Sequence, residues 1–387
     1  MLQRWIYEGE LEDPYNEFFV ACDVSVQEEE LWLRKYSMRE DMLPSFIGKA
    51  LAQKVGMLLI LAIIVYIFSI GKSLNFIRYS CHDDTLVSKP GDIVSDRLQV
   101  FQYGDIVTVE SSIDAAYIAT SRRLLDLLSG KYKLMDHFGA LKRYLLLGQG
   151  DFIQYLMDSL GEGLNKPANT LFRHNLTGTL ESAVRASNAQ YDDPEILGRL
   201  DVRLLEISPG DLGWDVFTLD YHVDSPINTV FTPQAMHQYL KLFNFLWRLK
   251  RVEHTLSASW RRMVTSGRKF GIISDRMFPI RYDKIVEIVP DLHQTRIVVS
   301  EMIHFVYQLQ YYYLFEVLEC SWDELINFIQ NKCIDLNSLI DAHSRYLNGI
   351  TDKGFLVGSK NQVSAHLGII DLWEDLELQS QKWSSTK

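Results

Sequence analysis

The sequence has 387 residues, a length that predicts two or three domains or one elongated helical chain. Hydrophobic residues make up 47% and charged residues 23%, which excludes a disordered chain, a collagen-like chain and a membrane protein with many spans. The formal net charge is −11, and an acidic chain of this kind is not expected to bind nucleic acid through its surface.

The first fifty residues are acidic, with 11 Asp or Glu against 5 Lys or Arg. No basic stretch followed by an apolar stretch opens the chain, so no signal peptide is expected. The start reads like the interior of a domain, which indicates a fragment. The four cysteines are scattered and form no C-x-x-C pair, so neither a zinc cluster nor a disulfide scaffold is expected, and a reducing compartment is indicated.

Residues 55–70 form the longest uncharged apolar run and lie between Lys54 and Lys72. A transmembrane helix needs about 20 residues, with a range of about 17–25, so this run is slightly too short. Taken alone, the run is compatible with a buried core helix, a marginal membrane anchor, or sequence foreign to the folded chain.

Helical periodicity dominates the rest of the chain, because apolar residues recur three to five positions apart. Thr232-Pro233 predicts the start of a long helix, with a hydroxyl N-cap and proline at the first helical position. Apolar helix faces are also predicted at 121–129, 133–147, 152–160, 296–318, 322–329 and 336–347.

Strand signals are few. The best are Leu200–Ile207 and Trp214–Val223, which could form a hairpin joined through Ser208-Pro209-Gly210-Asp211. The predicted fold class is therefore mainly α, as elongated helical bundles, with at most a short β-hairpin near 200–224.

Charge is unevenly distributed. Residues 241–281 contain 10 Lys or Arg and 2 Asp or Glu. A solvated basic face explains this stretch, and so does a docking surface for an acidic partner that is steered by charge.

No convincing catalytic constellation is present, so an enzyme is not expected. Gly148-Gln149-Gly150 resembles the start of a dinucleotide-binding loop, but the preceding segment predicts a helix, and a helix C-cap turn is favoured. Asp220, His222 and Asp224 alternate as on one strand face, yet no further metal ligand is suggested. We expect no metal and no cofactor.

Several ordered segments resemble one family, the gamma-tubulin complex proteins, and within it the component 3 or spindle pole body component type. The resemblance covers about residues 3–350. The segments that carry it are RWIYEGELEDPYNEFF (4–19), MLPSF (42–46), GKSLNF (71–76), RYLLLGQGDF (143–152), TLFRHNLTGTLESAVRASNAQ (170–190), LDVRLLEISPGDLGWDVFTLDYHVDSP (200–226), LFNFLWRLKRVE (242–253), QYYYLFEVLECSWDEL (310–325) and DLNSLIDAHSRYL (335–347).

The resemblance implies two tandem helical modules. Residues 1–130 would be the C-terminal part of the N-terminal module, 131–350 the gamma-tubulin-binding module, and 351–387 a divergent tail. The implied role is a non-enzymatic scaffold for microtubule nucleation. The implied partners are gamma-tubulin and other complex proteins, component 2 and its relatives among them. The implied location is the cytoplasm, cytoskeleton and microtubule-organising centre or spindle pole, with no nucleic acid and no membrane partner.

Interface residues follow from charge and motif placement. Trp214 is expected to be exposed in a Pro- and Gly-containing turn, and charged residues of the basic stretch are expected at the surface. The predicted gamma-tubulin interface comprises Trp214, Asp220, His222, Asp224, Arg248, Lys250 and Arg251. A second set, of large apolar residues, is predicted to be core: Trp5, Tyr7, Phe18, Phe243, Phe245, Trp247, Tyr312 and Trp322.

The sequence departs from the family pattern in three places. Most of the N-terminal module is expected to be missing, because the chain begins inside it. Residues 55–69 look inserted, and a retained intron would explain the insertion. Two alternatives remain: a core helix, and a membrane-tethered adaptor anchored through residues 55–70. Beyond about Thr351 the resemblance fades, and a truncated end would leave apolar helix faces uncovered.

Overall fold

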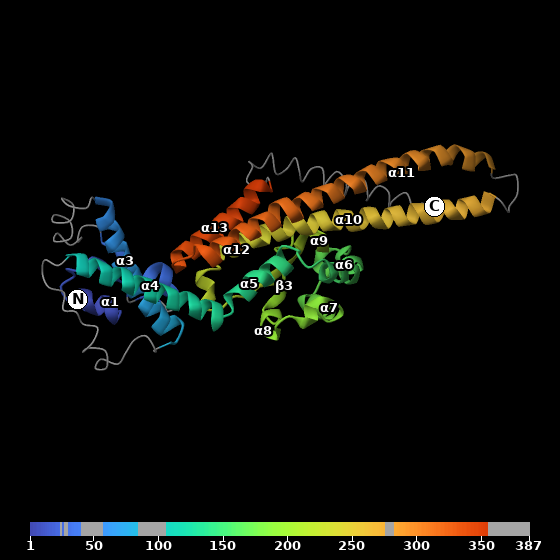
Figure 1. The fold of residues 1–387 in the computed structure, drawn as a ribbon. Helices are drawn as coiled ribbons and strands as arrows, with labels where there is room; N and C mark the ends of the chain where they lie inside the picture. The colour runs from blue at the N-terminus through green and yellow to red at the C-terminus, as the bar shows by residue number, and fades with distance from the viewer. Residues whose placement is uncertain (24, 27–29, 40–56, 84–105, 275–281, 355–387) are drawn as a thin grey trace. The chain divides into compact units, whose positions relative to one another are not determined.

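The computed structural model describes residues 1–23, 25–26, 30–39, 57–83, 106–274 and 282–354, with the backbone alone for 57–62, 106–109, 266–274 and 282–292. Most of these residues are helical (Figure 1). The α-helices are α1 (Leu2–Tyr7), α3 (Met57–Asn75), α4 (Ile106–Gly130), α5 (Leu134–Ala140), α6 (Gly150–Leu164), α7 (Arg173–Ala186), α8 (Pro194–Leu197), α9 (Gly213–Val216), α10 (Pro233–Ser274), α11 (Tyr282–Tyr311), α12 (Cys320–Asn331) and α13 (Leu336–Lys353).

The chain divides into two compact units. The N-terminal unit comprises Met1–His137, Val223–Gln234 and Asn327–His343. The C-terminal unit comprises the remaining segments Phe138–His222, Ala235–Ile326 and Ser344–Lys387. Neither unit is a continuous stretch of sequence, because each is completed by segments that lie far along the chain.

The apolar run forms most of α3, and the described part of this helix lies in the core of the N-terminal unit. Ile63, Ile64 and Ile67 are all buried. The indole Nε1 of Trp5 donates a hydrogen bond of 2.8 Å to the carbonyl oxygen of Ile67. Asn75 Nδ2 donates to the carbonyl of Gly9 at 2.6 Å, so the middle and the C-terminal end of α3 are tied to the first residues of the chain.

A buried helix is thus the form that residues 63–70 take, while 55 and 56 lie outside the described residues. Where the structure describes the chain, no helix combines the length and apolar content needed to cross a bilayer.

The N-terminal unit also contains a small antiparallel sheet that the sequence did not predict. Strand β1 (Val20–Cys22) pairs with β2 (Tyr36–Met38), with Ala21 opposite Ser37. Each strand has only three residues, too few for an alternating apolar pattern to be recognised. The pair supplements the predicted hairpin and leaves the fold class mainly α.

A histidine is buried in the N-terminal unit. The Nδ1 atom of His343 lies 3.2 Å from the carbonyl oxygen of Val230, and its ring packs edge-on against Phe231. Burial lowers the pKa of this imidazole to about 4. The ring is therefore neutral in the folded protein at pH 5, where an exposed histidine is mostly protonated.

This burial predicts a pH dependence of stability. The unfolded chain binds a proton at His343 near pH 6.5 and the folded chain only near pH 4, so the free energy of unfolding falls as the pH decreases between these values. We expect a loss of about 2 kcal/mol between pH 7 and pH 5. Urea unfolding at several pH values should show this slope, and His343→Gln should remove it. A matched change at the exposed His237, His237→Gln, should keep the slope; equal slopes in the two variants would contradict the prediction.

The predicted hairpin is present in the C-terminal unit. Strand β3 (Leu200–Leu204) pairs antiparallel with β4 (Phe217–Tyr221), with Val202 opposite Leu219. Both strands are shorter than expected. Strand β3 ends at Leu204, and β4 begins only at Phe217 because Trp214 to Val216 belong to the short helix α9. The inner face of the hairpin buries Val202, Phe217 and Leu219.

The long helices of the C-terminal unit begin where the sequence predicted. Helix α10 starts at Pro233, directly after Thr232, and runs antiparallel beside α11 (Figure 1). Lys250 contacts Gln310 at 3.4 Å, and Arg296 Nη2 donates to the carbonyl of Met263 at 3.1 Å, which fixes this direction. Phe243, Phe245 and Trp247 are buried as predicted, and so are Trp5 and Phe18 in the N-terminal unit. Tyr7, Tyr312 and Trp322 are only half-buried, because their rings lie at the edges of the cores.

The Gly148–Gly150 segment is a helix-terminating turn. Leu147, with φ of 54°, takes the left-handed position that glycine usually occupies. The N–H of Gly148 then donates to the carbonyl of Lys142 at 3.1 Å, six positions earlier, which closes the π-helical segment Leu141–Leu145. A Cβ on Gly148 would come within 2.9 Å of that carbonyl, so glycine is needed for close approach. A helix precedes the turn, and the strand that a dinucleotide-binding loop requires is absent from this position.

Candidate functional site

Trp214 is buried, with 5% of its surface exposed, contrary to the expectation of an exposed turn residue. Its Nε1 donates to Asn165 Oδ1 at 2.8 Å, and its ring centroid lies 5.7 Å from that of Trp247. The Pro-Gly turn is real, but the chain turns inward after Gly210 and begins α9. The apolar face of α10 therefore covers the indole.

Arg251 is also buried, with 8% exposed, although its charge predicted a surface position. Its guanidinium carbon lies 5.3 Å from the centroid of the Trp214 ring, in a cation–π contact. A carboxylate oxygen of Asp215 lies 3.9 Å from its Nη1. Arg251 thus covers Trp214, and these two predicted interface residues act together as internal packing.

The other two cations of the predicted set are half-buried. Lys250 donates to Glu253 Oε2 at 2.8 Å, and Gln310 Nε2 donates to the same carboxylate at 2.8 Å. Arg248 makes no ion pair or hydrogen bond within the described residues. Of the three basic residues, Arg248 is therefore the one whose charge is available to a partner.

The acidic and histidine members of the set lie at and after the hairpin. Asp220 is half-exposed and lies 3.7 Å from Arg203 on the neighbouring strand. His222 is exposed, and its backbone N–H donates to the carbonyl of Arg199. Asp224 is exposed and belongs to the N-terminal unit. In the described part of the chain, no three His, Cys, Asp or Glu side chains are close enough to hold a metal ion.

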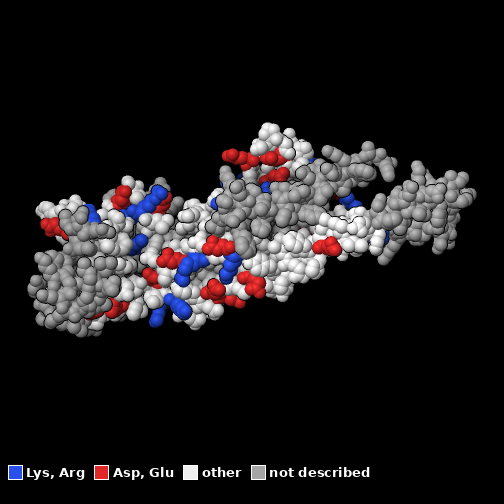
Figure 2. Space-filling view, turned by 90° about the horizontal axis from the view of Figure 1, so that it is seen from above, with Lys and Arg blue, Asp and Glu red and all other residues white. Residues whose placement is uncertain are grey.

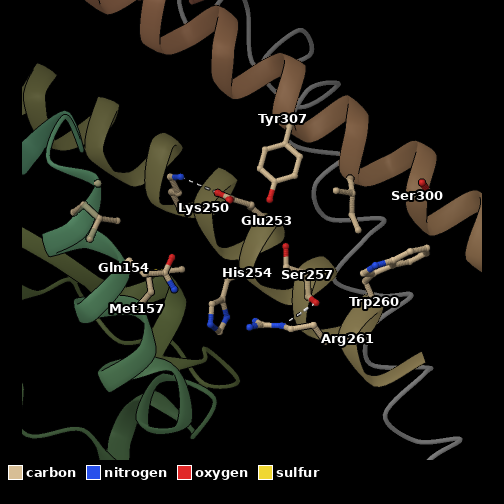
Figure 3. A pocket seen from close by; sticks show the side chains of 13 residues that line it. Gln154, Met157, Lys250, Glu253, His254, Ser257, Trp260, Arg261, Ser300 and Tyr307 are labelled. Atoms are coloured by element: carbon tan, nitrogen blue, oxygen red, sulfur yellow. Dashed lines mark hydrogen bonds and ion pairs between the residues drawn. The ribbon is translucent and has the colours of Figure 1, made fainter. Parts of the chain in front are cut away.

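A cavity of about 540 Å³ lies in the C-terminal unit between α6, α10 and α11 (Figure 3). Helix α6 contributes Gln154 and Met157, and α11 contributes Ser300 and Tyr307, whose ring points toward α10 in the figure. The α10 residues in its wall are Lys250, Glu253, His254, Ser257, Trp260 and Arg261.

The wall of this cavity is polar, and several of its polar side chains form hydrogen bonds with other residues of the chain. His254 Nε2 lies 3.2 Å from Asp158 Oδ1, and Arg261 Nε donates to the carbonyl of Ser257 at 3.3 Å. Lys250 was the one wall residue in the predicted interface set. Nothing in the sequence marked Tyr307 or Gln154 as cavity residues. The wall combines α6, α10 and α11, which are separated by about 100 and about 50 residues along the chain, so no local pattern contains it.

The surface mixes charges of both signs. In Figure 2, Lys and Arg side chains lie beside Asp and Glu side chains at several places on the visible described face. Within the described part of the basic stretch, Lys241, Arg261 and Arg262 are exposed. With the half-buried Arg248, these three supply accessible positive charge on the described part of α10.

The chain matches two family models. Residues 1–131 match the model described as gamma tubulin complex component N-terminal, and residues 134–381 match the model described as gamma tubulin complex component C-terminal. Together they account for nearly the whole sequence.

Three curated relatives illustrate the similarity. Human gamma-tubulin complex component 3 is 49% identical over 360 residues, covering 92% of this chain and 37% of the human protein. The spindle pole body component alp6 of Schizosaccharomyces pombe is 46% identical over 369 residues, with 94% and 41% covered. Mouse gamma-tubulin complex component 2 is 27% identical over 379 residues, with 90% and 38% covered. The chain therefore spans about two fifths of the length of these relatives.

Proposed function

Because this chain belongs to the gamma-tubulin complex component family, we propose that it is a scaffold component of a gamma-tubulin complex that binds gamma-tubulin and supports microtubule nucleation. The observation that carries the proposal is the match to both family models in order along one chain. The scaffold has no catalytic role, and the nucleotide chemistry belongs to the tubulins.

We propose a separate role for each of three consecutive segments of the chain. Residues 1–130 form the end of the N-terminal module, with 55–69 as an insertion whose described side chains, from residue 63 onward, lie in a core helix. Residues 131–350 form the gamma-tubulin-binding module. Residues 351–387 form a divergent tail, of which 355–387 lie outside the described residues. Other complex components, of the component 2 kind, are the proposed neighbours, and the spindle pole or microtubule-organising centre is the proposed location.

The proposed contact surface is narrower than the predicted set. Trp214 and Arg251 are buried and contact each other, so they would support the surface from within and not touch a partner. Arg248 carries the available charge on the same helix, and Asp220 and His222 lie on the hairpin edge. An accessible arginine beside a well-packed aromatic core is a usual anchor for a protein partner, and a positive α10 suits an acidic partner.

Reversing the charge of Arg248 should therefore weaken gamma-tubulin binding. We expect Arg248→Glu to reduce affinity by about tenfold or more in a pull-down with purified gamma-tubulin, because an interface arginine becomes a repulsive carboxylate. The fold should be unchanged, since Arg248 has no ion pair to lose within the described residues.

The matched control is Arg122→Glu, which changes the net charge equally at an exposed position of the N-terminal unit where the arginine has no ion pair within the described residues. This variant should bind like the parent chain. Equal binding by the parent and Arg248→Glu, with both folded by circular dichroism, would rule out Arg248 as a contact.

A further inference from the structure

The cavity between α6, α10 and α11 lies entirely within the C-terminal unit, and its wall contains three residue types that anchor protein partners. These residues are Trp260, Arg261 and Tyr307. Tryptophan, tyrosine and arginine are the residue types most enriched among those that carry the binding energy of protein interfaces. A volume of about 540 Å³ lies within the range of about 300–1,000 Å³ that ligand pockets occupy, so the cavity has room for more than one side chain.

The two aromatic rings of the wall keep part of their apolar surface exposed. Tyr307 is 47% exposed, and Trp260 is half-buried. In Figure 3 the Tyr307 ring points from α11 toward α10, the helix that carries Trp260. Within the described residues neither ring packs against another aromatic ring. An apolar side chain that entered the cavity would therefore gain aromatic contact area.

The acidic groups at the wall add little negative charge to the cavity. Lys250 donates to Glu253, and the same carboxylate accepts a second hydrogen bond from Gln310, so its charge is compensated. Asp158 lies within hydrogen-bond distance of His254. Asp158 is exposed to water, which screens its charge.

Arg261 is a cation of the wall that has no acidic partner within the described residues. Its side chain is exposed, and its Nε donates to the carbonyl of Ser257 in the same helix. Where the structure describes the chain, its two Nη groups have no acceptor. Figure 3 shows the guanidinium extending toward the His254 ring. A guanidinium with free N–H groups pairs best with a carboxylate, which accepts two parallel hydrogen bonds.

We propose that this cavity receives an acidic segment of gamma-tubulin, in which a carboxylate pairs with Arg261 and a neighbouring apolar side chain packs against Trp260 and Tyr307. The charge of Arg261 selects the sign of the partner, and the two rings supply apolar contact area. This inference rests on the proposed function, because it names the chemistry by which the C-terminal unit recognises gamma-tubulin.

Changing the charge of Arg261 in the full 387-residue chain tests the pairing. We expect Arg261→Glu to lower the affinity for purified gamma-tubulin by about tenfold or more. Arg261→Lys should lower it by about threefold, because lysine keeps the charge but loses the paired N–H groups. The fold should persist in both variants, since the described hydrogen bond of the Arg261 side chain lies within α10, and circular dichroism checks this.

The matched control is Arg262→Glu. Arg262 is exposed, carries the same charge one residue further along α10, and is not part of the cavity wall. Its reversal should lower the affinity by no more than about twofold, the effect of charge steering alone. Equal losses in Arg261→Glu and Arg262→Glu would overturn the inference and leave the proposed function standing. A parent chain that does not bind gamma-tubulin would overturn both.

Truncating the tyrosine tests the apolar part of the contact. Tyr307→Ala should weaken gamma-tubulin binding by about fivefold, because it removes an aromatic ring from the cavity wall. Phe305→Ala, at a position that is 55% exposed on the same helix but outside the wall, should leave binding unchanged. Equal binding by the Tyr307→Ala and Phe305→Ala variants would contradict the proposed packing.

Photocrosslinking identifies the occupant of the cavity. Benzoyl-phenylalanine in place of Tyr307 should crosslink to a segment of gamma-tubulin that contains Asp or Glu. Replacing the acidic residue that pairs with Arg261 by arginine should then restore binding to the Arg261→Glu variant, because the two charges are exchanged. Crosslinks to this chain alone, or no restoration by any acidic residue of the crosslinked segment, would overturn the proposal.

Discussion

Replacing Trp247 by alanine should lower the free energy of unfolding of the C-terminal unit by about 4 kcal/mol. Trp247 is 1% exposed, and three aromatic rings surround it. Its ring centroid lies 5.1 Å from that of Phe217 and 5.7 Å from that of Phe243, in addition to its contact with Trp214. Alanine would leave a cavity between α10, the hairpin and α9 that rigid rings cannot fill by small shifts.

Trp247→Phe is the informative comparison. The indole Nε1 of Trp247 is buried without a hydrogen-bond partner in the described structure, so tryptophan here carries a desolvation cost. Phenylalanine keeps most of the aromatic contact and removes this cost, and we expect a loss below about 1.5 kcal/mol. Urea unfolding, monitored by hydrogen exchange of peptides from α10 and the hairpin, gives the loss of free energy of unfolding for each variant. Similar losses in the two variants would show that ring packing does not dominate at this position.

Gly71→Ala should destabilise the N-terminal unit by about 3 kcal/mol, although alanine normally favours a helix by about 1 kcal/mol. A Cβ at this position of α3 would overlap the indole ring of Trp5. Trp5 is completely buried and its Nε1 is bonded to Ile67, so the ring cannot move aside without losing that bond. Small-to-large changes in such a contact force the backbone apart.

Gly130→Ala provides the matched control in the same unit. Gly130 is the last residue of α4, and a Cβ there would meet no atom within 4 Å. We expect its effect to stay within about 1 kcal/mol. Hydrogen exchange of peptides from α1 and α3 should quicken in Gly71→Ala and stay unchanged in Gly130→Ala. An unchanged exchange rate in Gly71→Ala would mean that α1 does not pack against α3 in solution.

The sequence predicted an element correctly where several neighbouring residues formed one recognisable pattern. The Thr232-Pro233 start of α10 and the partners of the β3–β4 hairpin are examples, since each rests on several residues of one pattern. The three-residue strands β1 and β2 gave no such pattern. The composition of the apolar run at 55–70 left a core helix, a membrane anchor and foreign sequence open. The burial of its described part in α3 depends on contacts with Trp5 and Gly9, some 60 residues away.

At the candidate site, the type of a residue did not predict whether it is exposed. Arg251 is charged yet buried, because its guanidinium lies over the Trp214 ring and near the carboxylate of Asp215. Trp214 follows a polar turn yet packs inward, because α10 supplies the apolar surface that covers it. Both outcomes depend on a helix that begins about twenty residues after Trp214, which no window around the turn contains.

The N-terminal unit is built from three separate segments of the chain, so it cannot be completed until the last of them has been synthesised. Its first segment ends at His137, but its last segment ends at His343, which bonds to Val230, and Asn337 of the same segment accepts a hydrogen bond of 3.1 Å from Trp32. At about 5–20 residues per second, a ribosome needs roughly 10–40 s to make the intervening residues. For that time the early helices, α3 with its apolar surface among them, emerge without their final partners. Nascent chains of this protein should therefore recruit chaperones until the segment that carries His343 has left the exit tunnel.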